Sequence, residues 1–286
     1  MDFYRRHIGP NEAELESMLK EVGYSHLDEM IAATVPEDIL QPNSFEGLKP
    51  AREREALAEL RKLSLSNKVK RSFIGLGYYE TVMPEVIKRC IWENPCWYTQ
   101  YTPYQAEISQ GRLEALLVFQ TMVSDLTALP VANASLLDEG TACAEAAMMA
   151  LRISKGKARK VLVSSGVFPQ TLSVLRTRIG NLGVELVEAK DVEGKIEEGV
   201  AAVIMQYPDL FGSIADLSGL ADKIHSAGGL LIVCADLLGL CLLKPPGEMG
   251  ADIAVGSTQR FGLPFGYGGP HAGYISCRDE LKRQLP

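Results

Sequence analysis

The 286-residue sequence lacks an excess of basic residues, and it lacks the long apolar run that a membrane-spanning helix needs. It has 29 Lys and Arg against 36 Asp and Glu, a net charge of −7, and its basic residues are dispersed. We therefore expect neither a nucleic acid nor a membrane surface as the main partner. The longest apolar stretch, residues 230–243, is interrupted by Asp236 and is too short to cross a bilayer.

Cysteine pairs and a targeting segment are also missing. The six cysteines include no C-x-x-C pair, and several lie in apolar runs, so buried thiols are expected rather than disulfides. The N-terminus has an early acidic residue and no apolar segment, which is unlike a signal peptide. These features predict a cytoplasmic protein in a reducing compartment.

Several catalytic motifs are absent as well. The sequence has no P-loop, no H-E-x-x-H and no G-x-S-x-G, which argues against nucleotide, zinc-protease and hydrolase functions. Its four histidines fall in different predicted elements, so no metal site is expected. Gly75-Leu76-Gly77 lacks the third glycine and the preceding strand of a dinucleotide fingerprint, which favours a close-packed turn.

The patterns that are present divide the chain into two parts. Residues 1–70 have short amphipathic helical patterns, the first starting at a capping box of Asn11 and Glu14, and they predict a helical arm without its own core. The rest alternates β-branched runs with helical runs, which predicts an α/β domain over residues 71–286 with a mostly parallel sheet covered on both faces. The predicted strands cover residues 161–165, 184–187, 202–206, 230–234, 253–256 and 273–276, and helices cover 169–179 and 217–227.

Two segments of the α/β part are candidates for ligand binding. Asp138-Glu139-Gly140-Thr141 begins a helix, so its backbone N–H groups either bind a phosphate or are capped by the two acids themselves. The acids would repel a phosphate, which favours capping. Residues 257–271 follow a strand at the carboxyl edge of the sheet, where open α/β proteins bind ligands. This edge therefore has a site or the remnant of one.

Three motifs resemble those of a known family. Residues 6–10 (RHIGP), residues 101–112 (YTPYQAEISQGR) and residues 257–271, which begin STQRFG and end GYGGPH, closely resemble the N-terminal half of glycine decarboxylase, the P-protein of the glycine cleavage system. The resemblance extends over essentially the whole chain. It implies an aminotransferase-like large domain of pyridoxal phosphate fold type I, preceded by the helical arm.

The resemblance also implies a chemistry and a place for the cofactor. The family uses pyridoxal phosphate to decarboxylate glycine and passes the aminomethyl group to the lipoyl group of H-protein. The cofactor lysine lies in the family's C-terminal half, in a His-Lys-Thr-Phe stretch that corresponds to residues 258–261, so Gln259 stands at its position. An amide cannot form an imine, which implies that a partner chain holds the cofactor.

The second cofactor anchor of the family is an Asp that faces the pyridine nitrogen. Counting back from Gln259 without gaps puts Val233 at its position, so Gln259 and Val233 mark a degenerate site. Asp236 could reach the pyridine of the cofactor if the strand is shifted, or it could cap the next segment of the chain. We favour the capping role. Lys244 lies on a Pro-rich loop and is a poor substitute for the lysine. Phe168 stands where many relatives have His.

Tyr101 and Tyr104 flank a Thr-Pro turn ahead of a helix. They are either core residues or, as the resemblance implies, residues that line the substrate site across a subunit interface. No residue of this chain is assigned a catalytic or metal-binding role. Relatives continue past Pro286 into a small domain and a second half, so we expect a fragment or a truncated subunit.

These observations predict the subunit of glycine dehydrogenase (aminomethyl-transferring) that does not bear the lysine. It would act in a hetero-oligomer with a lysine-bearing subunit 2, which binds pyridoxal phosphate, with lipoyl H-protein as the acceptor and glycine as substrate. The isolated chain is expected to be inactive. Two alternatives stay open: a structural or regulatory pseudoenzyme chain that stabilises its partner, and an autonomous pyridoxal phosphate enzyme that uses another lysine.

Overall fold

The computed structural model describes residues 7, 9–41, 47, 49–98, 107, 109–266, 269 and 271–286. The chain divides into two compact units, Met1–Arg71 and Ser72–Pro286, each of which is described by itself. Tyr101 and Tyr104, the two tyrosines singled out above, lie outside the described residues.

The first unit consists of the helices α1 (Glu12–Glu21), α2 (Leu27–Thr34) and α3 (Glu53–Leu65). The capping box at the start of α1 forms as predicted: Glu14 N donates to Asn11 Oδ1 at 3.0 Å, and Asn11 N donates to Glu14 Oε2 at 2.8 Å. Among the described residues of this unit, Leu19 is the single buried apolar side chain. Helices with so little burial depend on further contacts for their stability.

The second unit is built on one sheet, which has seven strands in the described part of the chain, in the order β1-β7-β6-β5-β4-β2-β3. The five strands from β3 to β6 run parallel, whereas β7 pairs antiparallel with β6 and with β1. The strands are β1 (Val131–Ala132), β2 (Lys160–Ser164), β3 (Glu185–Ala189), β4 (Val200–Tyr207), β5 (Leu230–Ala235), β6 (Ile253–Ser257) and β7 (Gly273–Cys277). This arrangement confirms the predicted α/β class with a mostly parallel sheet.

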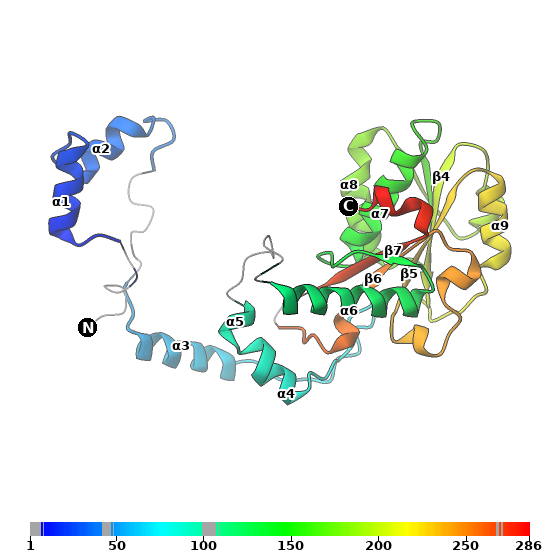
Figure 1. Ribbon diagram of the computed structural model, residues 1–286, viewed down its shortest axis with the longest axis horizontal. Helices are drawn as coiled ribbons and strands as arrows, with labels where there is room; N and C mark the ends of the chain where they lie inside the picture. The colour runs from blue at the N-terminus through cyan, green and yellow to red at the C-terminus, as the bar shows by residue number, and fades with distance from the viewer. Residues whose placement is uncertain are drawn as a thin grey trace. The chain divides into compact units, whose positions relative to one another are not determined.

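Helices cover both faces of the sheet (Figure 1). Alternate side chains of β5 enter two apolar cores: Leu231, Val233 and Ala235 join the core of α6 and α9, and Ile232 and Cys234 join the core of α7 and α8. Such burial on both faces explains why the parallel strands have uninterrupted apolar sequences. The helices of this unit are α4 (Glu85–Ile87), α5 (Pro95–Tyr98), α6 (Gln110–Thr127), α7 (Glu139–Ile153), α8 (Pro169–Ile179) and α9 (Ser218–Ser226).

The helix α7 fits closely against the sheet because its inner residues are small. Ala142, Ala146 and Ala150 are buried, and a Cβ on Gly140 would lie 3.1 Å from the Val174 side chain of α8. This contact fixes the start of α7 beside the carboxyl ends of the parallel strands. The ends of these elements therefore meet at one edge of the sheet, which is where the candidate site lies.

The cysteines only partly match their prediction. Cys143, Cys234 and Cys277 are buried, but Cys90, Cys96 and Cys241 are exposed, and no disulfide joins any of these six described residues. The exposed cysteines lie outside the apolar strands and helix faces that form the cores. No helix in the described ranges has the length and apolar character that crossing a membrane requires.

Candidate functional site

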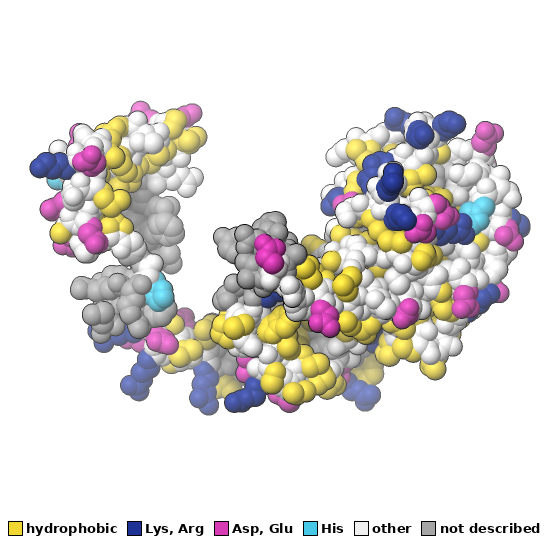
Figure 2. Space-filling view, in the orientation of Figure 1, with side chains coloured by type: hydrophobic (Ala, Val, Ile, Leu, Met, Phe, Trp, Pro, Cys, Tyr) yellow, Lys and Arg dark blue, Asp and Glu magenta, His cyan; other side chains and the backbone are white. Residues whose placement is uncertain are grey.

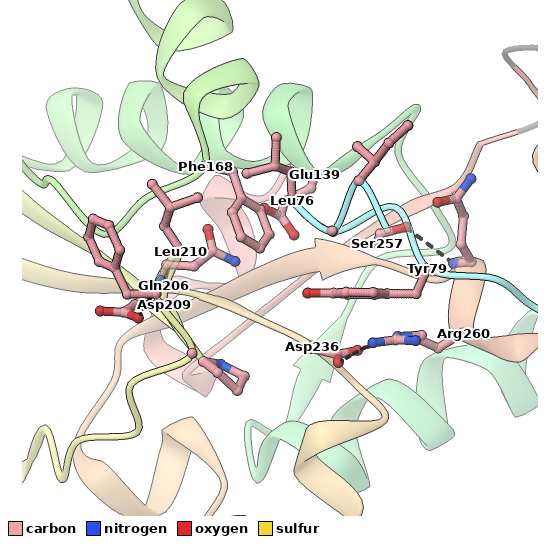
Figure 3. A pocket seen from close by; sticks show the side chains of 17 residues that line it. Leu76, Tyr79, Glu139, Phe168, Gln206, Asp209, Leu210, Asp236, Ser257 and Arg260 are labelled. Atoms are coloured by element: carbon pink, nitrogen blue, oxygen red, sulfur yellow. Dashed lines mark hydrogen bonds and ion pairs between the residues drawn. The ribbon is translucent and has the colours of Figure 1, made fainter. Parts of the chain in front are cut away.

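A cavity of about 380 Å³ lies at the carboxyl ends of β4, β5 and β6 (Figure 3). Open α/β sheets place ligands at this edge. A loop from the start of the second unit closes one side, and the segment after β4 closes another. The lining residues are Ile74, Gly75, Leu76, Gly77, Tyr79, Glu139, Phe168, Gln206, Pro208, Asp209, Leu210, Phe211, Gly212, Asp236, Ser257, Gln259 and Arg260.

An ion pair forms one wall of the cavity. Asp236 follows the last residue of β5 and accepts two hydrogen bonds from Arg260, from Nε at 3.0 Å and from Nη2 at 2.9 Å. The ring of Tyr79 lies over the guanidinium, 3.8 Å from Cζ to the ring centroid (Figure 3). Leu238 N also donates to Asp236 Oδ1 at 3.2 Å, in agreement with the favoured capping role of Asp236. A bidentate and stacked guanidinium is held in one orientation.

Glu139, at the start of α7, is a carboxyl group of the cavity whose pKa is raised. Burial raises the pKa of Glu139 from its ordinary value of 4.5 to about 7, while hydrogen bonds from Gln206 and Thr171 act in the opposite direction. The negative charges of Asp236 and Asp138 raise this pKa further. The Thr171 hydroxyl lies 3.3 Å from Glu139 Oε1. At neutral pH the protonated and ionised forms of Glu139 are therefore both populated.

Asp138 caps α7 and occupies the end of the helix. Thr141 N donates to Asp138 Oδ1 at 2.7 Å, and Asp138 has the extended backbone of an N-cap residue. The N-terminus of α7 is thus capped by its own carboxylate, as the sequence favoured. A phosphate at this end would lie beside the carboxylates of Asp138 and Glu139.

Gln206 reaches the cavity from β4 and is 6% exposed. Its Oε1 is buried and has no hydrogen-bond partner among the described residues. A buried acceptor without a donor destabilises the folded state, which makes Gln206 unusual among the polar groups here. Its side chain lies next to Glu139 (Figure 3).

Gln259, the first residue of a single turn after β6, lines the cavity and is 4% exposed. Its Nε2 lies within hydrogen-bond distance of His271 Nδ1, at 3.0 Å. Gln259 N donates to Ser257 Oγ at 3.2 Å, and the His271 ring packs edge-on against Tyr78. The predicted position of Gln259 at the strand end is therefore found, with its amide held by neighbours.

Val233 does not line the cavity. It lies inside β5, which continues to Ala235, and its fully buried side chain belongs to the core of α6 and α9. An ungapped count from a motif cannot sense where a strand ends, so it selected a core residue. The side chain that the end of β5 offers to the cavity is Asp236.

Two further residues considered from the sequence are also placed. Lys244 is exposed, lies 3.4 Å from the Ser218 hydroxyl and does not line the cavity. Phe168 does line it, and a Cβ on Gly77 would lie 3.0 Å from the Phe168 ring. Gly77 has a φ of +85°, so both its backbone and this contact require glycine. The turn predicted at residues 75–77 thus closes the cavity against Phe168.

Sequence reasoning missed two arrangements in this site. The first is the proximity of Glu139 to Gln206, and the second is the contact of Tyr79 with the Asp236–Arg260 pair. Asp236 and Arg260 each follow a predicted strand, which is a signal that they meet at the same edge. Nothing in the sequence indicates the pairing of Glu139 with Gln206, because it depends on how α7 packs beside β4.

The fold and the cavity define an open α/β protein with a cavity where such proteins bind ligands, at the carboxyl edge of the sheet. Residues 5–286 match the family model described as glycine cleavage system P-protein, and the chain belongs to this family. The fold type I architecture inferred from the resemblance agrees with this match and with the solved relative described next.

Curated relatives and one solved structure give the extent of the similarity. The chain is 54% identical over 282 residues to glycine dehydrogenase (decarboxylating) of Cereibacter sphaeroides, which covers 99% of this chain and 29% of the relative. It is 55% identical to the Sinorhizobium medicae protein of the same name, of which it covers 30%. A crystal structure of glycine decarboxylase (P-protein) of the glycine cleavage system, in inhibitor-bound form, matches with a TM-score of 0.87 and 39% identity. That match covers the whole of this chain and 65% of the solved one. The chain thus spans less than a third of the length of its curated relatives.

Proposed function

We propose that this chain is the part of a glycine dehydrogenase (decarboxylating) that does not bear the cofactor lysine. In the proposed assembly, a lysine-bearing polypeptide binds pyridoxal phosphate, glycine is decarboxylated, and the aminomethyl group passes to the lipoyl group of H-protein. The observation that carries this proposal is Gln259, an amide in the turn after β6 at the edge of the cavity. An amide cannot form the imine by which a lysine holds the aldehyde of the cofactor.

The other residues around the cavity do not fit pyridoxal phosphate either. The described residues that line it include no lysine, and Arg260 is already paired with Asp236. At the start of α7 the Asp138 carboxylate accepts from Thr141 N, and the carboxylates of Asp138 and Glu139 disfavour a phosphate at this helix end. We therefore route no step of the reaction through a cofactor in this chain.

The surface of the second unit supports a role in an assembly. Large apolar side chains are exposed in the segment of residues 73–98, which runs from the first loop of this unit to the end of α5. Hydrophobic atoms gather on the surface over α4 and the helical turn that follows it (Figure 2). Extended apolar patches on soluble proteins commonly mark contact surfaces. The residues concerned are Phe73, Ile74, Val82, Val86, Ile87, Ile91, Trp92, Trp97 and Tyr98.

Coexpression with a lysine-bearing polypeptide of the same family tests this proposal. We expect release of labelled CO₂ from carboxyl-labelled glycine, in the presence of lipoylated H-protein, only when both polypeptides are present. An assembly that remains equally active without this chain would contradict the proposal.

The alternative of an autonomous enzyme is tested on the chain alone. After incubation with pyridoxal phosphate and reduction with borohydride, the intact mass of the chain should show no stoichiometric adduct. The lysine-bearing polypeptide, treated in the same way, is the positive control. A single adduct on one lysine of this chain, together with glycine decarboxylation, would favour the autonomous enzyme.

A further inference from the structure

The cavity has more acidic groups than its one cation can neutralise. Glu139, Asp209 and Asp236 line it, and Arg260 alone is basic among the described lining residues. Arg260 gives its Nε and Nη2 donors to Asp236 and its flat face to Tyr79, so its charge is already compensated by Asp236. Asp209 accepts from Phe211 N and Ser213 N and thereby stabilises its own loop. Neither Asp209 nor Glu139 has a basic partner among the described residues, and Glu139 is the one of the two that lies beside Gln206.

Within the described residues, no ion pair links Glu139 to a basic side chain. Its hydrogen-bond donors are the Thr171 hydroxyl, at 3.3 Å, and the Gln206 amide. Burial and the neighbouring carboxylates raise the pKa of Glu139 to about 7, so its ionised form lacks sufficient stabilisation. A cation beside this carboxyl group would stabilise the ionised form.

Gln206 gives a second, independent indication. It is 6% exposed, it lines the same cavity, and its buried Oε1 has no donor in the described chain. Nearly all buried polar atoms in proteins have a hydrogen-bond partner. The missing partner of Gln206 Oε1 is an N–H or O–H group, and the same side chain is hydrogen-bonded to Glu139, which lacks a positively charged partner.

The size and the apolar wall of the cavity set limits on the ligand. Its volume of about 380 Å³ lies at the lower end of the range for small-molecule sites, which is about 300–1,000 Å³. Phe168, Leu210 and Phe211 contribute apolar surface to the same cavity. A small ligand with one charged end and a short carbon body matches these features.

We propose that this cavity binds a small organic molecule through a primary ammonium group, which forms an ion pair with Glu139 and donates a hydrogen bond to Gln206. An ammonium has three N–H donors and one positive charge, which are the two things that the cavity lacks. The group can belong to a simple amine or to an amino acid. This site is separate from the proposed assembly function, because it requires neither a lysine nor a partner chain.

Titration calorimetry on the 286-residue chain tests the proposal with methylammonium, ethylammonium and glycine as probes. Acetate, which has no positive charge, and tetramethylammonium, which has no N–H donor, are the matched controls. We expect at least one primary ammonium probe to bind and both controls to bind at least about tenfold more weakly. Binding of glycine alone would assign the ammonium to an amino acid, and binding of the alkylammonium probes would assign it to an amine.

The pH dependence and two variants complete the test. Because the ammonium pairs with the ionised form of Glu139, affinity should rise about tenfold per pH unit below pH 7 and level off above it. Binding near pH 7 should release protons, which calorimetry in two buffers of different ionisation enthalpy measures. Glu139→Gln and Gln206→Leu should each weaken binding by about tenfold or more, whereas Glu188→Gln, on the exposed edge strand β3, should leave it unchanged.

Three results would overturn the proposal: no binding of any primary ammonium probe, equal binding of acetate, or unchanged affinity in Glu139→Gln. Thermal unfolding of each variant verifies that it is folded. The proton-release measurement uses the unsubstituted chain, so it decides the question even if a variant fails to fold. None of these measurements involves glycine turnover, so their failure would leave the proposed assembly function untouched.

Discussion

At the scale of single residues, Glu139 makes the stability of the chain depend on pH. Its pKa is raised from 4.5 to about 7 in the folded protein, so the folded state binds this proton more tightly than the unfolded state does. The wild-type chain should therefore lose stability at this site as pH rises from about 4.5 to 7. Glu139→Gln keeps the shape and removes the charge, so it should be more stable than wild type at pH 8, by about 1–3 kcal/mol.

Urea unfolding of both chains at pH 5 and pH 8 measures this effect. At pH 5 the two chains should differ little, since Glu139 is then largely protonated in the folded state. Glu188→Gln on the surface serves as the control, and it should show no such difference between the two pH values. A Glu139→Gln chain that is less stable than wild type at pH 8 would show that the carboxylate is well stabilised in the cavity.

The site residues differ in how far the sequence could predict them. Gln259 could be located in advance from a motif. The edge of the sheet that has the cavity could be located from the alternation of strands and helices. Asp236 was found at the end of its strand, whereas Val233, chosen by counting, lies in the core. Glu139 and Gln206 lie far apart in sequence, and only the packing of α7 beside β4 brings them together.

At the scale of elements, Asp252 joins three parts of the second unit. It is 2% exposed and precedes β6, and its Oδ2 accepts from Leu231 N of β5 at 2.7 Å and lies 2.8 Å from His225 Nε2 of α9. Arg278, after β7, pairs with its Oδ1 at 3.0 Å. Removing the buried carboxylate leaves Leu231 N without its acceptor and Arg278 without its ion-pair partner, so Asp252→Ala should destabilise the chain by about 2–4 kcal/mol.

Denaturant unfolding of Asp252→Ala and of the control Asp279→Ala measures this prediction. Asp279 pairs with Lys282 in an exposed turn at 2.9 Å, and an exposed pair of this kind contributes less than about 1 kcal/mol. The loss of unfolding free energy in Asp252→Asn should fall between those of the two alanine variants, because the amide keeps an acceptor for Leu231 N. Equal losses in Asp252→Ala and Asp279→Ala would contradict the role given to the buried cluster.

Most elements could be predicted because their signals are local. The helix α8 has the predicted bounds, residues 169–179. The parallel strands begin and end within one or two residues of their predicted bounds. The strand β1 was missed because its two residues have no pattern of their own and are defined by pairing with β7, far along the chain. Propensity and periodicity describe local order, whereas such edge pairings depend on the tertiary fold.

At the scale of the whole molecule, the chain spans less than a third of the length of its curated relatives, and it exposes a group of large apolar side chains that the proposed assembly would cover. The proposed assembly gives Tyr101 and Tyr104 a role that this chain alone does not require. They would line the substrate site of the lysine-bearing partner, with their hydroxyls donating to the glycine carboxylate. The rival role, stabilisation of the partner without contact to its site, assigns these hydroxyls no effect on turnover.

Tyr101→Phe and Tyr104→Phe in the intact assembly separate these roles, because each substitution removes a hydroxyl and keeps the ring. A lost hydrogen bond to a charged group corresponds to about 1.5–3 kcal/mol, so kcat/KM for glycine should fall by about 10–100-fold. Tyr24→Phe, which removes the hydroxyl of a tyrosine in the first unit, outside the apolar patch described above, is the matched control and should keep full activity. Size-exclusion chromatography verifies that each variant still assembles. Normal turnover in both variants, with the assembly intact, would exclude the lining role and leave this chain as a stabilising subunit.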